Sequence, residues 1–297
     1  MHANIQPHII SKCGRRENNE DVERYRMNLH PDGFIVNPKY APGDFFLICD
    51  GHGGDAVAKY VAPVLEKFLM EKSKRYPLKV EYINAVYNYI QKSLKNHPEN
   101  ISKHCGCTAL AVIIYFDNNN KRFAQIINSG DCRAIMSKDG LANPLSIDHK
   151  PSWPDEKQRI DRVNKIYATK KKVTFIDHDF RIGDLSVSRS FGDLDNTPHV
   201  THIPEIYNYE IDETVEFIVM ACDGVWDVLR NEEVVNFVRD HKNENHIDLY
   251  NIPHIYPFEK LINPYNIAEK LANYAIARGS TDNISIIIIF FDKWSLF

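Results

Sequence analysis

The chain has 297 residues, a length that corresponds to one large domain or two small ones. Apolar residues make up 43% and charged residues 26%, which is typical of a globular protein and excludes a disordered tail, a collagen and a coiled coil. The net charge is −4, so we expect neither nucleic acid nor an anionic membrane as a partner. A small anionic substrate held through metal ions is compatible with this charge.

The six cysteines indicate a reducing compartment, because none of them forms the Cys-x-x-Cys spacing typical of zinc sites and redox pairs. Cys49 and Cys222 lie inside apolar runs, where we expect them to be buried. The N-terminal segment lacks the apolar stretch of a signal peptide. The longest apolar run, at 286–291, is far below the ~20 residues that a membrane span needs. We therefore expect a soluble protein of the cytoplasm, with the nucleus as an alternative.

Short runs rich in β-branched and aromatic residues predict strands, and apolar residues at a spacing of three and four predict helices. In chain order, the predicted elements are a strand over 45–49, helices over 57–69 and 80–94, strands over 108–116 and 122–128, a hairpin over 134–141, a strand over 217–222, helices over 232–239 and 267–277, and a strand over 284–291. Strands joined by short turns, with helices in pairs, favour an α+β fold of antiparallel sheets covered by helices over a βαβ repeat.

The segment from about 143 to 182 differs from the rest of the chain. It contains no glycine and little periodicity, so we expect a long irregular excursion, and such loops are usually functional or mobile. No linker-like stretch divides the chain. The sequence therefore predicts a single domain over 1–297 that carries one flap-like excursion.

Acidic residues stand next to several of the apolar runs. Asp50 and Asp223 each follow a predicted strand, Asp131 follows the run that ends at residue 128, and Asp282 precedes the last strand. Asp50 and Asp223 each precede a glycine, and Asp-Gly is also a common turn pair, so turn geometry alone would explain either of them. Together, carboxylates at the ends of buried strands converge on one sheet edge, where their repulsion is costly unless cations lie between them.

Oxygen ligands without a cluster of His or Cys suit Mg²⁺ or Mn²⁺. Two such ions ~3.5–4 Å apart form a site for phosphoryl transfer. Arg16, four residues before Glu20, is the candidate that holds the phosphate, because a guanidinium fits its oxygens bidentately. His52, two residues after Asp50, is the candidate acid for a leaving group near neutral pH. The plain alternatives are a solvated arginine in a charged cluster and a surface histidine.

These residues resemble the metal-dependent serine/threonine protein phosphatases of type 2C, and the resemblance runs from about residue 12 to 292. Eight segments occur in the order of the family, which makes the resemblance specific. They are Arg16-x-x-x-Glu20-Asp21, Phe46-Leu-Ile-Cys-Asp50-Gly-His52-Gly-Gly, Gly106-Cys-Thr108-Ala-Leu, Asn128-Ser-Gly130-Asp131-Cys-Arg133, Asp148-His-Lys-Pro151, Leu185-Ser-Val-Ser-Arg189-Ser-Phe-Gly-Asp193, Ala221-Cys-Asp223-Gly-Val-Trp226-Asp227 and Gly279-Ser-Thr-Asp282-Asn283.

The resemblance implies a sandwich of two antiparallel β-sheets flanked on both faces by helix pairs. It also implies hydrolysis of phosphoserine and phosphothreonine in phosphoproteins by a water activated between two Mg²⁺ or Mn²⁺ ions, without a covalent phosphoenzyme. Asp50 would bridge the two metals, with the carbonyl of Gly51 as a further ligand. Asp223 and Asp282 would complete the direct ligands.

Further roles follow from the same resemblance. Glu20 and Asp21 would act through metal-bound waters, and Asp131 with Asp223 would hold a weaker third metal. Arg16 would bind the phosphate and His52 would be the general acid. Thr108, Asp193, Trp226 and Asp227 are assigned to packing and turn geometry. We expect a monomer.

One feature departs from the family pattern, because the excursion lacks the usual glycine pair and carries Lys170-Lys171-Lys172 instead. This basic run either attracts acidic phosphopeptides or is a solvated loop face.

Three other functions compete with this phosphatase. Asp193-x-Asp195-x-Thr197 spells the pattern of phosphatases with an aspartyl nucleophile, but no hydrophobic strand precedes it. A two-metal nuclease would need a basic groove with aromatic residues. A catalytically silent binding module would be expected to have lost metal carboxylates that are present here.

Overall fold

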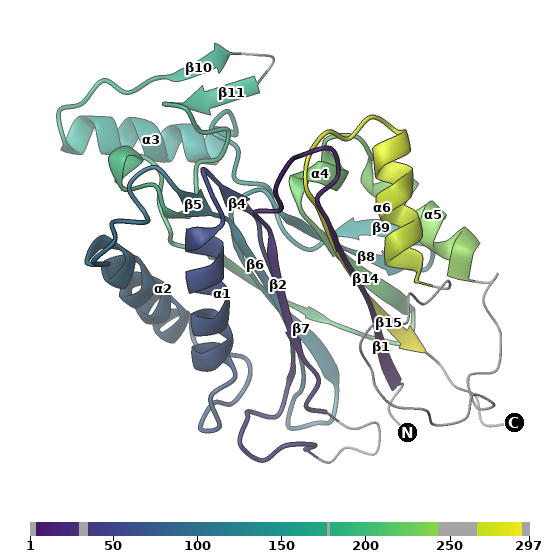
Figure 1. The fold of residues 1–297 in the computed structure, drawn as a ribbon. Coiled ribbons are helices and arrows are strands. Elements are labelled where there is room, and N and C mark those ends of the chain that lie inside the picture. The colour runs from purple at the N-terminus through teal and green to yellow at the C-terminus, as the bar shows by residue number, and fades with distance from the viewer. Residues whose placement is uncertain (1–3, 30–34, 177–178, 243–265, 293–297) are drawn as a thin grey trace, which may run out of the picture.

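The computed structural model describes residues 4–29, 35–176, 179–242 and 266–292 of the chain. Two five-stranded antiparallel sheets pack face to face (Figure 1). The first sheet has the strand order β1 (Asn4–Lys12), β15 (Ile284–Asp292), β14 (Val215–Ala221), β8 (Arg133–Lys138) and β9 (Leu141–Pro144). The second has the order β13 (Glu205–Glu210), β7 (Arg122–Ser129), β6 (Ala109–Phe116), β3 (Asp44–Cys49) and β2 (Val22–Arg26).

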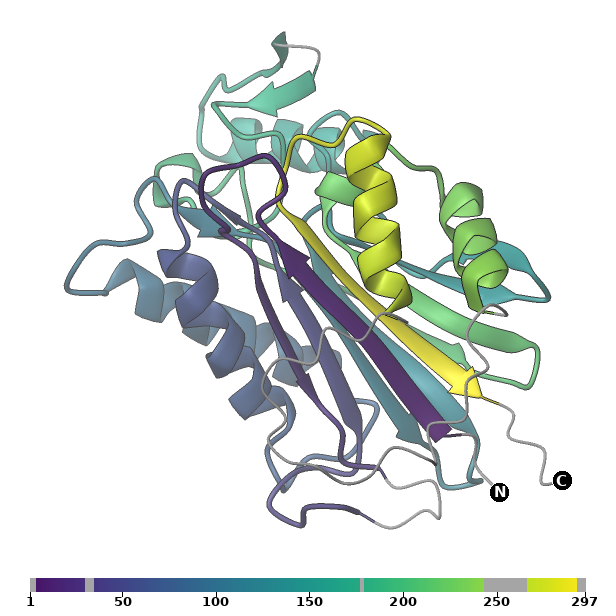
Figure 2. The ribbon, with the colours of Figure 1, turned by 45° about the vertical axis from the view of Figure 1, so that its right-hand side comes forward.

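Helices cover the outer face of each sheet, which gives the four layers that the sequence predicts (Figure 2). The second sheet is covered by α1 (Ala56–Leu69) and α2 (Val80–Lys95). The first is covered by α5 (Asn231–Lys242) and α6 (Ile267–Ala277). Among the described helices, none combines the length and the apolar character needed to cross a membrane.

The central strands are apolar on both faces because each face meets a different core. On β3, Phe46 and Ile48 face the opposite sheet, whereas Phe45, Leu47 and Cys49 pack beneath α1 and α2. This arrangement explains the continuous apolar runs in the sequence, since a strand buried on both sides has no reason to alternate.

The structure confirms every predicted strand and helix to within two or three residues at each end. Within the two five-stranded sheets, the strands that the sequence reasoning missed are β1, β2 and β13, which all lie at sheet edges. Their side chains are only partly buried and include many polar residues, as in Val-Glu-Arg-Tyr-Arg of β2. Edge strands can therefore lack the apolar signature on which strand prediction rests.

The prediction of an irregular excursion over 143–182 is wrong. This stretch contains α3 (Pro154–Ile166) and a hairpin of β10 (Val173–Ile176) and β11 (Asp179–Ile182). Helix α3 buries only Glu156 and Ile160, so it shows no apolar stripe in the sequence. Instead, Glu156 pairs with Arg159 within the helix and with Arg189 outside it, and the pair with Arg189 attaches the helix to the rest of the chain.

A small third sheet lies where the strands of the sandwich end. Its order is β12 (Phe191–Gly192), β5 (Gly106–Cys107) and β4 (Gly51–His52). The one-turn helix α4 (Asp223–Trp226) begins at the end of β14. These short elements carry several of the residues singled out by the sequence.

Candidate metal centre

Three of the predicted metal ligands converge at one end of the sandwich. Oxygen atoms of Asp50, Asp131 and Asp223 all lie within 4.8 Å of one another. Asp50 follows β3 of the second sheet, Asp223 follows β14 of the first, and Asp131 lies in the turn from β7 to β8 that crosses between the sheets. The packing of the two sheets therefore brings together carboxylates that are far apart in the chain.

The environment of this cluster opposes its negative charge. Burial raises the pKa of Asp50 well above its usual range, and the nearby Asp21, Asp223 and Asp131 raise it further. Burial and the charge of Asp131 do the same to the pKa of Asp223. Close carboxylates in a buried site are stable in the ionised form when cations lie between them. An all-oxygen donor set of this kind fits a hard divalent ion such as Mg²⁺ or Mn²⁺.

Lys150 supplies one positive charge to the cluster, and the sequence reasoning assigned it no role. Its ammonium group donates a hydrogen bond to Oδ2 of Asp131. Burial lowers the pKa of Lys150, but the charges of Asp131 and Asp223 outweigh this effect and raise it. The only signal in the sequence was its place in the Asp148-His-Lys-Pro151 segment.

Asp282 and Arg16 form an ion pair beside the cluster. Nη2 of Arg16 donates to Oδ2 of Asp282 at 2.7 Å, so a predicted phosphate-binding group contacts a predicted metal ligand. Asp282 is not one of the three carboxylates within mutual reach, although its charge raises the pKa of Asp50 and Asp223. The Arg16 side chain is 58% exposed and therefore accessible from solvent.

Glu20 and Asp21 approach the cluster from the segment that leads into β2. The backbone N–H of Glu20 donates to the side chain of Asn283 at 2.9 Å. The backbone of Glu20 passes so close to Gly51 that any side chain at Gly51 would clash with it, which explains the glycine. Asp21 is buried, and its Oδ2 accepts a hydrogen bond from Ser285 at 2.6 Å.

The second oxygen of Asp21 is also informative. Oδ1 is buried without any hydrogen-bond partner in the part of the chain that the structure describes. Burial raises the pKa of Asp21 to about 7, although the hydrogen bond from Ser285 opposes this. A buried carboxylate oxygen without a partner is costly, and it fits a water molecule or cation at this position.

His52 is held on the third sheet by a buried carboxylate. Its Nε2 lies 2.8 Å from Oδ2 of Asp193, which also accepts a hydrogen bond from Ser190. The φ of 48° at Asp193 agrees with the turn geometry that the resemblance implies, but Asp193 also orients His52. Gly106 lies against both side chains, and a Cβ there would clash with them. Burial lowers the pKa of His52, but the bond to Asp193 outweighs this and the pKa is raised.

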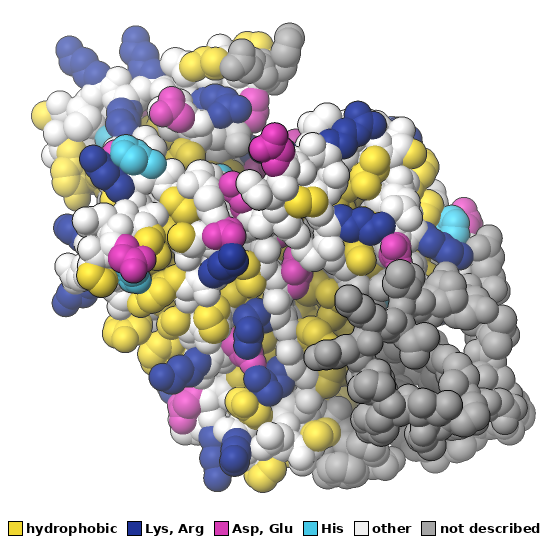
Figure 3. Space-filling view, in the orientation of Figure 1, with side chains coloured by type: hydrophobic (Ala, Val, Ile, Leu, Met, Phe, Trp, Pro, Cys, Tyr) yellow, Lys and Arg dark blue, Asp and Glu magenta, His cyan; other side chains and the backbone are white. Residues whose placement is uncertain are grey.

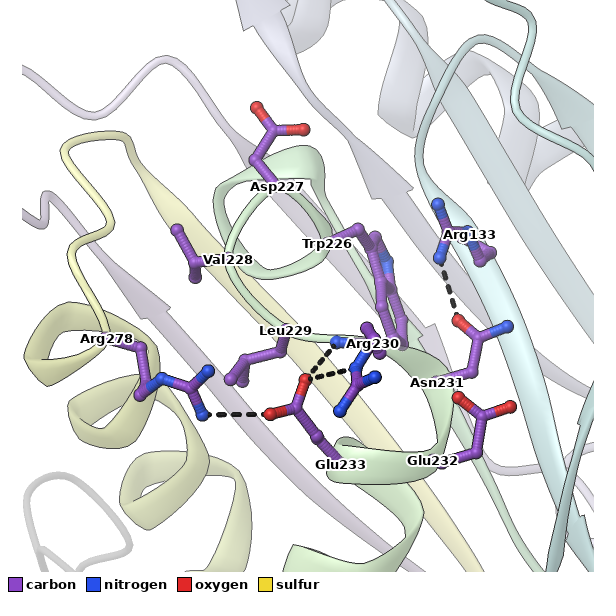
Figure 4. A pocket seen from close by; sticks show the side chains of 10 residues that line it. All are labelled: Arg133, Trp226, Asp227, Val228, Leu229, Arg230, Asn231, Glu232, Glu233 and Arg278. Atoms are coloured by element: carbon purple, nitrogen blue, oxygen red, sulfur yellow. Dashed lines mark hydrogen bonds and ion pairs between the residues drawn. The ribbon is translucent and has the colours of Figure 1, made fainter.

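A pocket of about 530 Å³ opens beside Asp227 (Figure 4). The arginines in its wall are already paired. Arg133 donates to Asn231 at 2.7 Å and binds Asp148 through two further nitrogens, while Arg230 and Arg278 both contact Glu233. Figure 4 shows Asp227 pointing away from these pairs. This pocket therefore offers an anion little uncompensated positive charge.

Comparisons with known proteins agree with this geometry. A sequence model described as Protein phosphatase 2C matches residues 7–284. The chain is 33% identical over 283 residues to a probable protein phosphatase 2C 7 of Oryza sativa subsp. japonica, covering 94% of this chain and 63% of the rice protein. It is 63% identical over 177 residues to a PP2C-like domain-containing protein of Acanthamoeba polyphaga mimivirus, covering 59% of this chain and 99% of the viral protein.

A solved structure shows the same fold. The serine-threonine phosphatase 2C from Toxoplasma gondii superimposes with a TM-score of 0.72 at 19% identity, covering 98% of each chain. The family model spans most of the sequence, and the acidic cluster agrees with a metal-dependent enzyme. The chain belongs to the protein phosphatase 2C family and carries a protein serine/threonine phosphatase domain, which is a hydrolase.

Proposed function

We propose that this chain hydrolyses phosphoserine and phosphothreonine in phosphoproteins with the help of two Mg²⁺ or Mn²⁺ ions. The observation that carries the proposal is the convergence of Asp50, Asp131 and Asp223, whose oxygens lie within 4.8 Å of one another. Asp131 is buried and Asp50 and Asp223 are half-buried, and carboxylates at this spacing repel each other. The repulsion is relieved when divalent cations bind. A silent module would gain nothing from retaining this cluster.

The direct ligands would be Asp50, the carbonyl of Gly51, Asp223 and Asp282. Glu20 and Asp21 would act through bound waters, for which the unpartnered oxygen of Asp21 leaves an acceptor. Asp131 and Asp223 would hold a weaker third ion, and Lys150 would have to release Asp131 first. When bound, the ions would supply an activated water and neutralise charge on the phosphate.

Arg16 and His52 would act on the substrate. Only one nitrogen of Arg16 contacts Asp282, so the other N–H groups can bind phosphate oxygens. As the bond from phosphorus to the serine or threonine oxygen breaks, His52 would donate a proton to that oxygen, and the phosphorus would gain the oxygen of water. Asp193 would keep the imidazole oriented and favour its protonated form.

The architecture also supports proposals about the whole chain. We infer a single domain over 1–297, because one apolar core receives side chains from β1, β3, β14 and β15 of both sheets. We further infer a monomer of the cytoplasm or nucleus that binds neither nucleic acid nor membrane, in line with the net charge of −4.

The decisive experiment measures phosphate release from a phosphothreonine peptide with Mn²⁺, with Mg²⁺ and with chelator. We expect turnover only with a metal, and we expect Asp223→Asn to lose it while circular dichroism shows an intact fold. Calorimetric titration with Mn²⁺ provides a second readout, in which the variant should bind the ion more weakly. A folded wild-type protein without turnover under any of these conditions would favour the silent binding module instead.

A further inference from the structure

A second pocket, of about 390 Å³, lies between β2 and the C-terminal half of α1. Its charged lining consists of five basic and two acidic side chains, which are Arg24, Arg26, Lys39, Lys67, Lys72, Glu66 and Glu71. Figure 3 shows Lys and Arg side chains gathered over the region of α1 and β2. The pocket thus has an excess of positive charge, whereas the chain as a whole carries −4.

A buried carboxylate orients the two arginines of this pocket. Arg24 and Arg26 lie on the same face of β2, and their Nε atoms donate to different oxygens of Glu66 on α1. The Glu66 side chain is only 6% exposed, whereas those of Arg24 and Arg26 are 40% and 30% exposed. The guanidinium of Arg26 also lies over the ring of Tyr40, 3.8 Å from its centre.

One carboxylate thus neutralises only one of two fixed guanidinium groups. Nη1 and Nη2 of Arg24 and Nη1 of Arg26 have no acceptor within the described residues. Guanidinium groups whose direction is fixed in advance bind carboxylate or phosphate with less loss of conformational entropy.

The three lysines of the pocket add charge without compensation. In the described part of the chain, none of Lys39, Lys67 and Lys72 forms an ion pair, and Glu71 contacts Lys74 instead at 3.4 Å. Some lysines elsewhere, such as Lys121 and Lys138, pair with acidic residues, whereas the lysines at α2 form no ion pair among the described residues. The lysines of the pocket therefore differ in being gathered beside Arg24 and Arg26. The pocket beside Asp227 differs from this one, because its arginines all form ion pairs.

We propose that this pocket docks a segment rich in Asp and Glu on the phosphoprotein substrate, separate from the phosphorylated residue that is hydrolysed. The inference rests on the proposed phosphatase function and narrows its substrate class. The positive charge is spread over five side chains from three chain segments, which matches several carboxylates along a peptide better than one phosphate group. Charge complementarity of this kind gives selectivity and faster association.

The position of the pocket is compatible with simultaneous docking and catalysis. Arg24 pairs with Leu47 and Arg26 with Phe45, so they lie three and five strand positions before Asp50. At ~3.3 Å per residue, the backbone positions of the arginines are roughly 10 and 17 Å from that of Asp50 along the strand. A linker of about five or six extended residues between the acidic segment and the phosphoresidue can span the longer of these distances.

The test compares two variants that remove the same charge. Lys39→Ala/Lys67→Ala/Lys72→Ala alters the pocket, and Lys79→Ala/Lys92→Ala/Lys95→Ala removes three exposed lysines at α2 as the matched control. Direct binding is measured by fluorescence anisotropy with an unphosphorylated Asp/Glu-rich peptide in the presence of chelator. Because three partly exposed ion pairs are lost, we expect the Kd to rise about tenfold in the pocket variant and little in the control.

Kinetics with metal then separate docking from catalysis. For a phosphothreonine peptide with an acidic segment, KM should rise about tenfold in the pocket variant with kcat unchanged. For p-nitrophenyl phosphate, the pocket variant, the control and the wild type should agree. Equal behaviour of the two variants toward the acidic peptide would overturn the proposal, as would pocket-dependent binding of inorganic phosphate or anionic vesicles in place of the peptide.

The two proposals fail in different ways. Pocket-dependent binding of the acidic peptide without turnover of any phosphosubstrate would leave the docking site standing and reject the phosphatase function. Turnover with equal KM values for the wild type and the pocket variant would support the phosphatase function and reject the docking site.

Discussion

At the scale of single residues, the candidate acid depends on a partner that is 141 positions away in the chain. Asp193 is buried, contacts Nε2 of His52 and accepts a further hydrogen bond from Ser190. Because a protonated imidazole must remain aimed at the leaving oxygen, the loss of this carboxylate should impair the chemical step rather than substrate binding.

The first prediction concerns this contact. Asp193→Asn should lower kcat for a phosphothreonine peptide by about 10- to 100-fold with little change in KM, which is less than the ~10²–10⁴-fold range of a whole general acid. His52→Ala should have the larger effect. Both variants should affect p-nitrophenyl phosphate much less, because its leaving group needs no proton. Steady-state kinetics with the two substrates test this.

The matched control for that experiment is Asp195→Asn, which changes an exposed acid two positions away that pairs with His104. It should retain wild-type kcat for both substrates. If Asp193→Asn slowed the two substrates equally, the residue would have a structural role and no part in proton donation.

Asp44 illustrates a buried carboxylate that the site does not use. Its Oδ1 accepts hydrogen bonds from the backbone of Asn28 at 2.6 Å and Leu29 at 2.8 Å, while Oδ2 has no partner in the described residues. Burial raises the pKa of Asp44 to about 6, above the 3.8 of a free aspartate. The folded state therefore binds a proton more tightly, and this contribution to stability is lost as the pH rises from 4 to 6.

The second prediction follows from this loss of stability with rising pH. Asp44→Asn keeps an acceptor for both backbone groups and removes the titration. Relative to the wild type, the variant should be more stable at pH 8 than at pH 4, with a difference between the two pH values of roughly 2–3 kcal/mol. Urea unfolding at both pH values measures it. If the free energies of unfolding of variant and wild type differed by the same amount at both pH values, the titration of Asp44 would not be the cause.

At the scale of elements, the sequence predicts the strands whose residues are largely buried, because burial gives them continuous apolar runs. The central strands β3, β6, β7, β14 and β15 are apolar on both faces, and their runs end where the structure ends them. The edge strands and α3 could not be predicted in this way, because the edge strands are only partly buried and rich in polar residues, and α3 buries only Glu156 and Ile160. The same reasoning found Asp50, Asp131 and Asp223 at strand ends, but not Lys150, whose role depends on a fold that sets it beside Asp131.

The third prediction concerns α3 and its ion pairs. Burial alone would raise the pKa of Glu156, but hydrogen bonds from Arg189 and Arg159 lower it to about 2. Its contribution to stability is therefore present above pH 4.5 and is lost as the pH falls toward 2. Glu156→Gln should destabilise the fold by about 2–3 kcal/mol at pH 7, and the difference from the wild type should shrink as the pH falls below 4.5. Urea unfolding from pH 7 to pH 3 tests this, with the exposed Asp155→Asn as control.

At the scale of the whole molecule, the metal centre lies at the junction of the two sheets. Asp50 comes from the second sheet and Asp223 from the first, so repulsion between them acts directly across the sandwich. Lys150 offsets the charge of Asp131, whereas Asp50 and Asp223 form no ion pair among the described residues. A cation shared by both sheets would therefore link them and stabilise the folded state by mass action.

The last prediction uses stability as a readout that does not depend on turnover. Adding Mn²⁺ or Mg²⁺ to protein stripped by a chelator should raise the Tm, since an ion at 100 times its Kd adds about 2.7 kcal/mol to the free energy of unfolding. Asp223→Asn removes one negative charge from the cluster, so without metal it should melt at or above the temperature of the wild type. On addition of metal, the Tm of the variant should rise much less than that of the wild type. Thermal unfolding of both proteins, with and without Mn²⁺, tests this, and an equal gain for the two would place the bound ion away from Asp223.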